Sequence, residues 1–150
     1  MNKVWKFGHF ILKISYYFYI IGISKILEKI KFKGVCITLA NLNQLKLFRN
    51  IHMRGIGGTS MSGIAEMLKH WGFHVTGSDD NSSELTDKLI DRGIPVTIGY
   101  DFNNLSKASL VVYTAAIKPD DPELLKAKEL NIPTVERADF LGEITKAFED

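Results

Sequence analysis

Hydrophobic and polar positions alternate between two patterns after about residue 46. Short apolar runs bounded by turn residues are typical of buried strands, and Ala108–Tyr113 is the clearest of them. Between these runs, apolar residues recur every three or four positions, as Ile64, Met67, Leu68 and Trp71 do. Strand and helix patterns in regular alternation predict an α/β domain built on a parallel sheet.

The turn residues divide this region into separate elements. The expected strands are 50–54, 73–77, 94–98, 108–113 and 132–135, and the expected helices are 59–71, 84–92, 123–130 and 137–148. Gly72 and Gly93 follow two of these helices as C-terminal caps, and Ser82 or Ser83 precedes the second helix as its N-cap. Connections this short, with right-handed crossovers, predict a Rossmann-like open parallel sheet with helices on both faces.

Ligands of such sheets bind beyond the carboxyl ends of the strands. The segments that follow the expected strands at this edge are 55–62, 78–81, 99–101 and 114–117. They are the predicted binding edge.

The start of the chain has a different composition. Residues 1–50 carry nine Lys and Arg and one acid, a net charge of +8, whereas residues 51–150 carry ten and sixteen, a net charge of −6. Nine of the sixteen aromatic residues also lie in the first fifty. We therefore divide the chain into a basic, apolar N-terminal extension at 1–45 and a Rossmann-like domain at 46–150.

Three interpretations of the extension stay open. Its most apolar run, Ile14–Ile23, has ten residues, whereas a membrane-spanning helix needs about 20. The segment is an amphipathic helix on a membrane surface, an uncleaved anchor, or a stretch translated from upstream of the true start without a selected role. Membrane contact is expected only if residues 1–34 are genuine.

Other chemistry has little support. Cys36 is the single cysteine, so no internal disulfide is possible. The histidines have no metal-ligand spacing with carboxylates or a thiol, so no metal site is expected. Basic residues in 51–150 are dispersed, which argues against nucleic-acid binding. Asp120, Asp121 and Glu123 are interpreted as a solvated helix start.

The segment Gly55–Gly63 has the residues of a phosphate-binding loop. It reads GIGGTSMSG and joins the first expected strand to the first expected helix. Such a turn lets backbone N–H groups approach a phosphate, and the helix N-terminus adds partial positive charge. The loop therefore predicts binding of a nucleotide diphosphate.

The loop by itself leaves NAD as one candidate ligand. The G-x-G-x-x-G fingerprint is only partly met, because Ser60 stands where the third glycine would fall. Asp79 lies near the position of the acidic residue that binds a ribose hydroxyl in NAD sites. An NAD-binding regulatory module is thus the alternative from another functional class.

A family resemblance favours a different ligand. The run Ile51–Glu66 resembles the start of the Mur ligases, most of all the branch that joins L-alanine to UDP-N-acetylmuramate. Further segments match in register at 75–79, 98–101, 114–118, 121–123 and 137–141, so the resemblance covers about residues 48–148. Two positions depart from the family pattern: Ser60 replaces a frequent glycine, and Tyr100 replaces a frequent histidine.

The resemblance implies that this domain binds UDP-N-acetylmuramate in the cytoplasm. The glycine loop would hold the diphosphate, Asp79 would face the uridine, Tyr100 could stack on the uracil, and the 114–117 segment would line the sugar side. The residues expected to bind the substrate are Gly55, Gly57, Gly58, Thr59, Ser60, Met61, Ser62, Ser78, Asp79, Tyr100, Thr114, Ala115, Ala116 and Ile117. No catalytic residue is expected among them.

The resemblance also implies that full-length members of the family use ATP and Mg²⁺. No G-x-x-x-x-G-K-[ST] loop occurs in the 150 residues, so no cofactor is expected in this chain and it should not hydrolyse ATP alone. The chain would then be the substrate-binding domain of a ligase, truncated or encoded apart from its catalytic portion, which would be its partner. The recycling ligase that attaches a ready-made peptide to the same UDP-sugar is the alternative within the family.

Overall fold

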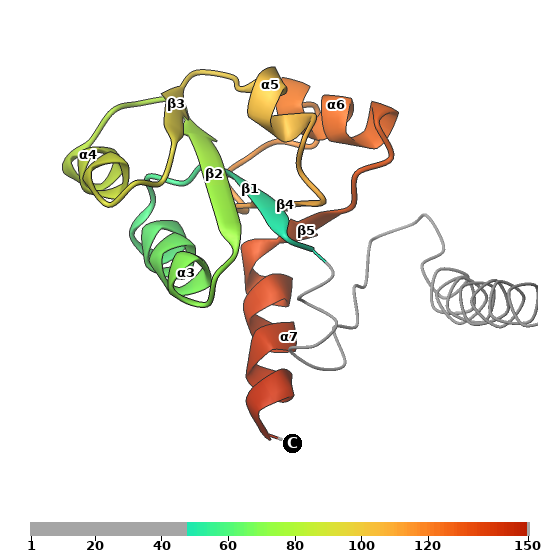
Figure 1. The fold of residues 1–150 in the computed structure, drawn as a ribbon. Coiled ribbons are helices and arrows are strands. Elements are labelled where there is room, and N and C mark those ends of the chain that lie inside the picture. The colour runs from blue at the N-terminus through green and yellow to red at the C-terminus, as the bar shows by residue number, and fades with distance from the viewer. Residues whose placement is uncertain (1–47, 150) are drawn as a thin grey trace, which may run out of the picture. The chain divides into compact units, whose positions relative to one another are not determined.

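β1 lies at the centre of a sheet of five parallel strands in the order β3-β2-β1-β4-β5 (Figure 1). The computed structural model describes residues 48–149. Its strands are β1 (Asn50–Arg54), β2 (His74–Asp79), β3 (Val96–Ile98), β4 (Leu110–Tyr113) and β5 (Thr134–Glu136). Its helices are α3 (Thr59–His70), α4 (Glu84–Asp91), α5 (Phe102–Leu105), α6 (Pro122–Glu129) and α7 (Arg137–Glu149).

The predicted α/β fold is confirmed, with helices on both faces of the sheet. Figure 1 shows α5 and α6 on one face and α3, α4 and α7 on the other. Several strand bounds differ from the sequence prediction by one or two residues; β2, for example, ends at Asp79 rather than at residue 77. The four-residue helix α5 was not expected, and β3 begins at Val96 rather than at residue 94. The predicted extension at 1–45 lies outside the described residues.

Side chains of β1 alternate between the two helix layers. Ile51 and Met53 are buried apolar residues, as a central strand of a parallel sheet requires. His52 and Arg54 are also buried, but their side chains reach the start of α6. Because successive side chains of a strand point to opposite faces, the polar pair lies under α5 and α6, and the apolar pair faces the other layer.

Buried apolar residues lie on both faces of the sheet. Under α5 and α6, the buried residues Leu105, Val111 and Ala127 pack together. On the other face, α3 buries a stripe at helical spacing that includes Ile64, Ala65 and Leu68. Within residues 48–149, no helix is both long enough and apolar enough to cross a membrane.

Candidate ligand-binding site

The strand order changes direction beside β1, which pairs with β2 on one side and β4 on the other. The segments that follow β1 and β4 turn to opposite faces of the sheet. This divergence opens a crevice at the carboxyl ends of these two strands. The four segments predicted as the binding edge lie at the carboxyl ends of β1, β2, β3 and β4, and the segment 78–81 includes the last two residues of β2. All four therefore lie along this same edge of the parallel sheet.

The glycine loop after β1 is a tight turn anchored on β2. Gly55 has a φ of 81°, a backbone conformation that residues with a Cβ rarely adopt. The N–H groups of Gly55 and Ile56 both donate to the carbonyl oxygen of Ser78, at 2.8 and 3.1 Å. The position of the loop thus depends on where the end of β2 lies.

The N-terminus of α3 has no side-chain cap. Its N-cap residue is Gly58, and its first turn contains no acid. By contrast, the side chains of Ser83, Asp101 and Asp121 cap α4, α5 and α6. An uncapped N-terminus leaves N–H groups and the positive end of the helix dipole available to an anion.

The first hydrogen bond of α3 runs from the N–H of Ser62 to the carbonyl of Gly58, at 2.8 Å. Among the described residues, the N–H groups of Thr59, Ser60 and Met61 have no hydrogen-bond acceptor. Arg137, at the start of α7, donates from Nη1 to the hydroxyl of Ser60 at 2.9 Å. A cation beside the positive end of a helix raises the local potential further, so an anionic group is the ligand that this place favours.

Asp79 at the end of β2 lies against the glycine loop. Its Oδ2 accepts a hydrogen bond of 2.8 Å from the N–H of Gly57, and its Oδ1 accepts one of 3.2 Å from the N–H of Asn81. The acid predicted to face the uridine therefore also fixes one N–H of the loop. A Cβ added to Gly57 would lie 2.9 Å from Asp79 Oδ2 and 2.9 Å from Thr86 Cγ2, closer than real contacts allow.

This close approach gives a first prediction. Gly57→Ala should lower the free energy of unfolding by about 1–3 kcal/mol, because the methyl group must displace Asp79 or Thr86. Gly63→Ala is the matched control, since Gly63 lies in α3 with nothing within 4 Å of its added Cβ. The control should be neutral or stabilising, by up to about 1 kcal/mol. Urea denaturation of both variants checks this, and equal stability of the two would contradict it.

A cavity of about 370 Å³ opens at the same edge on the α6 side of the sheet. Ala116 and Ile117 of the predicted sugar-side segment line it, together with Tyr100. Tyr100 is 48% exposed, its ring is stacked on Phe102, and the guanidinium of Arg54 lies 4.9 Å from its ring centroid. The other lining residues are Arg54, Asp80, Lys118, Asp120, Asp121 and Pro122.

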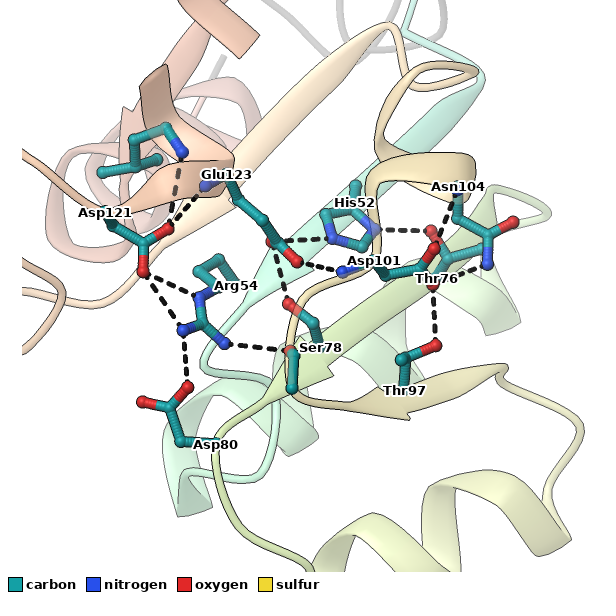
Figure 2. Close-up of polar contacts among 12 residues, drawn as sticks. His52, Arg54, Thr76, Ser78, Asp80, Thr97, Asp101, Asn104, Asp121 and Glu123 are labelled. Carbon is teal, nitrogen blue, oxygen red and sulfur yellow. Dashed lines mark hydrogen bonds and ion pairs between the residues drawn. The ribbon is translucent and has the colours of Figure 1, made fainter. Parts of the chain in front are cut away.

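Arg54 lines this cavity and contacts three segments of the chain, as Figure 2 shows. Its Nη2 lies 2.6 Å from Asp80 Oδ1 and 3.1 Å from Asp121 Oδ2, and its Nη1 donates to the carbonyl of Gly99 at 3.4 Å. Burial by itself would lower the pKa of Arg54, but the hydrogen bonds to Asp80 and Asp121 outweigh it and hold that pKa above its ordinary value.

A second cluster lies directly beneath the edge. Glu123 accepts hydrogen bonds from Nε2 of His52, the hydroxyl of Ser78 and the N–H of Asp101 (Figure 2). Nδ1 of His52 lies 2.9 Å from the hydroxyl oxygen of Thr76. A neutral imidazole with its proton on Nε2 satisfies both partners, because it donates to the carboxylate and accepts from the threonine hydroxyl.

The interpretation of Asp121 and Glu123 as a solvated helix start is wrong. Glu123 is 0% exposed and Asp121 is 9% exposed, whereas Asp120 is exposed as expected. Burial is possible because each of the two carboxylates has charged or polar partners on β1, and Asp121 also caps α6. The two acids join the helix to the sheet instead of facing water.

The two buried carboxylates of this cluster, Glu123 and Asp101, are negatively charged. Burial would raise the pKa of Glu123, but hydrogen bonds from His52, the Asp101 N–H and Ser78 outweigh it and lower the pKa below its ordinary value. For Asp101, burial also acts to raise the pKa, and hydrogen bonds from Asn104 and Thr97 lower it overall.

The remaining predicted site residues lie in different surroundings. Thr59 and Ala115 are exposed at the edge, and the Thr114 hydroxyl accepts a hydrogen bond from the N–H of Ala116 at 3.2 Å. Met61 is buried, and Ser62 is buried with its hydroxyl donating to the carbonyl of Thr59. Ser78 is 0% exposed, with its hydroxyl turned to Glu123 rather than to the edge.

The sequence prediction missed His52, Arg54, Asp121 and Glu123 as residues of this region, and it placed Asp80 on the binding edge without a role. A signal was present in β1, where two polar residues alternate with apolar ones in a strand that the topology buries on both faces. Polar side chains on such a strand require partners on the helix that covers them. That requirement points to the Asp-Pro-Glu start of α6.

Comparisons with known proteins show the family to which this region belongs. Residues 50–149 match the family described as "Mur ligase family, catalytic domain". The chain belongs to the Mur ligase family. A UDP-N-acetylmuramate–L-alanine ligase of Acetivibrio thermocellus is 54% identical over 101 residues, which are 67% of this chain and 22% of that protein. A protein of the same name from Clostridium botulinum strain Hall is 52% identical over 100 residues, again 67% and 22%.

Solved structures of Mur ligases show the same fold. The crystal structure of UDP-N-acetylmuramate–alanine ligase from Thermotoga maritima has a TM-score of 0.59 and 33% identity, covering 61% of this chain and 21% of that one. A UDP-N-acetylmuramate:L-alanyl-gamma-D-glutamyl-meso-diaminopimelate ligase from Neisseria meningitides has a TM-score of 0.56 and 31% identity, covering 64% and 31%. The chain thus spans about a fifth of the length of the ligases whose sequences it matches.

Proposed function

We propose that residues 48–149 bind UDP-N-acetylmuramate as the substrate-binding part of a peptidoglycan-precursor ligase. The observation that carries the proposal is the uncapped N-terminus of α3, which follows a glycine loop at the point where the strand order changes direction. Relatives with about half of their residues identical over this region are named for a reaction of this sugar nucleotide.

In this proposal the diphosphate lies at the first turn of α3. The N–H groups of Thr59, Ser60 and Met61 would donate to phosphate oxygens, and the helix dipole would favour the negative charge. The guanidinium of Arg137 beside Ser60 adds a full positive charge close to the same turn. The binding chemistry is provided by backbone groups and does not require any bond of the diphosphate to break.

The uridine would lie toward the end of β2, and the sugar toward the segment after β4. Asp79 supplies a carboxylate for a ribose hydroxyl or the uracil N–H, and the half-exposed ring of Tyr100 supplies a flat face for the base. Thr114 and Ala115–Ile117 would then line the sugar side. The added amino acid and the ATP and Mg²⁺ of the full reaction would meet parts of a ligase outside this region.

A direct titration tests the ligand. The full chain, in isothermal titration calorimetry, should bind UDP-N-acetylmuramate and UDP but not NAD. Tight binding of NAD with no response to either uridine nucleotide would overturn the proposal and favour the NAD-binding module. The likeness to the Neisseria ligase, at 31% identity, keeps the peptide-adding branch as a second candidate, which would bind the same sugar nucleotide.

Asp79→Ala should weaken the binding of UDP-N-acetylmuramate about tenfold or more, because the loop N–H of Gly57 and the ligand both lose the carboxylate. Asp91→Ala, at an exposed position at the end of α4, is the control and should bind as the unaltered chain does. Calorimetry with both variants gives the comparison. Unchanged affinity in Asp79→Ala would remove Asp79 from the site.

A further inference from the structure

The carboxylate of Glu123 contacts two of the four segments of the binding edge, through Ser78 and Asp101, and it also contacts β1 through His52. It is 0% exposed, and it belongs to α6, on the face of the sheet opposite to α3. Its Oε2 lies 2.8 Å from the hydroxyl of Ser78 and 3.1 Å from Nε2 of His52, and its Oε1 accepts from the N–H of Asp101 at 2.6 Å. Figure 2 shows these donors converging on one side chain from β1, β2 and the turn after β3.

One of these donors connects Glu123 to the glycine loop. The hydroxyl of Ser78 binds the carboxylate, while the carbonyl oxygen of the same residue accepts the N–H groups of Gly55 and Ile56. Ser78 therefore has its side chain fixed from one face of the sheet and its carbonyl engaged with the loop that leads into α3. A shift of Glu123 would move the acceptor on which this loop rests.

Another donor connects Glu123 to the turn that carries Tyr100. The N–H of Asp101 binds Glu123, and the N–H of Gly99 binds the carbonyl of Asp79 at 2.7 Å. The carboxylate of Asp101 accepts from the Thr97 hydroxyl and caps α5. Tyr100 thus lies between two residues whose N–H groups are hydrogen-bonded, and one of these two bonds is to the same buried acid.

We propose that Glu123 is a positioning residue of the ligand site, which holds the Gly55–Gly57 loop and the Gly99–Asp101 turn in the arrangement that the nucleotide needs. Because it is wholly buried, it acts through Ser78 and Asp101 and does not touch the ligand. As a statement about ligand affinity, this inference rests on the proposed function.

Glu123→Gln is the main test because it keeps the shape of the side chain. The glutamine oxygen can accept from the Asp101 N–H, but its amide nitrogen then faces the Ser78 hydroxyl and Nε2 of His52. Since an amide N–H donates, the imidazole proton must move to Nδ1, and the Ser78 hydroxyl must turn away. The ¹⁵N chemical shifts of His52 report this change of tautomer directly.

Glu129→Gln is the matched control. Glu129 lies on the same helix, its side chain is 67% exposed, and its partner in the described region is Lys126. The same chemical change at this position leaves β1, β2 and the two turns untouched. Ser78→Ala is a second variant, which removes one donor to Glu123 and leaves the other two in place.

Calorimetry is done on the full-length chain at a temperature where every variant is folded. Glu123→Gln should then bind UDP-N-acetylmuramate at least about tenfold more weakly than the chain without substitutions. Ser78→Ala should weaken binding less, and the double variant should fall short of the product of the two single effects, because both changes act through one link. Amide signals of Gly55, Gly57 and Asp101 should shift in Glu123→Gln and stay in place in Glu129→Gln.

Equal affinity of Glu123→Gln and the unaltered chain, in folded protein, would overturn the inference while leaving the proposed function intact. Absence of binding by the unaltered chain would instead contradict the proposed function. Even then, the amide signals of Glu123→Gln test whether Glu123 holds the two turns. If the signals of Gly55 and Gly57 do not shift in this variant, the positioning role of Glu123 is also contradicted.

Discussion

Arg54→Met is expected to lower the free energy of unfolding by about 3 kcal/mol. Methionine keeps much of the side-chain volume under α6 but removes the guanidinium that pairs with Asp121. Asp121 is only 9% exposed, so its charge would remain buried without its cationic partner. Loss of one partner from a buried ion pair typically costs about 3–5 kcal/mol. The lower end applies here because the N–H groups of Glu123 and Leu124 still donate to Asp121.

Two further variants separate the buried pair from the exposed one. Asp80→Asn removes the charge of the other carboxylate that pairs with Arg54. The Asp80 side chain is 62% exposed, and water screens such pairs, so the loss should stay below about 1 kcal/mol. Arg54→Met with Asp121→Asn removes both buried charges and keeps a good helix cap. This double variant should be more stable than Arg54→Met alone, by about 1–2 kcal/mol.

Urea denaturation followed by circular dichroism measures all three variants. If the double variant is less stable than Arg54→Met, the unpaired buried charge of Asp121 is not the cause of the lost stability. A loss of about 3 kcal/mol in Asp80→Asn would show that the exposed pair, not the buried one, holds the edge together.

The layout of the domain could be predicted because its signals are local. The apolar run at β4 and the helical spacing of α3 each specify their element within about a dozen residues. The glycine loop likewise carries its own backbone requirement, and Gly55 has the positive φ that such a turn needs. Helix α5 was missed because its four residues are too few to show any period, and its cap, Asp101, was interpreted only as part of the binding edge.

The polar clusters beneath the edge could not be predicted in the same way. Glu123 meets residues 71, 45 and 22 positions earlier in the chain, and these separations follow from the strand order, not from any repeat in the sequence. An acid at the first turn of a helix is most often solvated, and that general tendency gave the wrong answer. Glu123 is an exception because His52 of β1 lies beneath this first turn and forms a hydrogen bond with its carboxylate.

Acid should destabilise the domain through Glu123. Its pKa in the folded state lies below the ordinary value that it regains on unfolding. A group of this kind contributes its full stabilisation above the unfolded-state pKa and loses it as the pH falls through the folded-state pKa. Asp101 has a shift of the same sign, so both carboxylates act in the same direction. We therefore expect the free energy of unfolding to fall steadily as the pH is lowered from the ordinary range of carboxyl pKa values.

Glu123→Gln separates this contribution from that of every other acid. At neutral pH the variant should be less stable by roughly 2 kcal/mol, because hydrogen bonds to a buried charged acceptor are replaced by weaker ones. The difference should shrink on acidification, since protonated Glu123 no longer offers a charged acceptor. Glu129→Gln, changed at an exposed position, should remain parallel to the unaltered chain at all pH values. Denaturation curves between about pH 3 and 7 decide the matter. A constant gap between Glu123→Gln and the unaltered chain would mean that Glu123 keeps its ordinary pKa and that its hydrogen bonds do not depend on its charge.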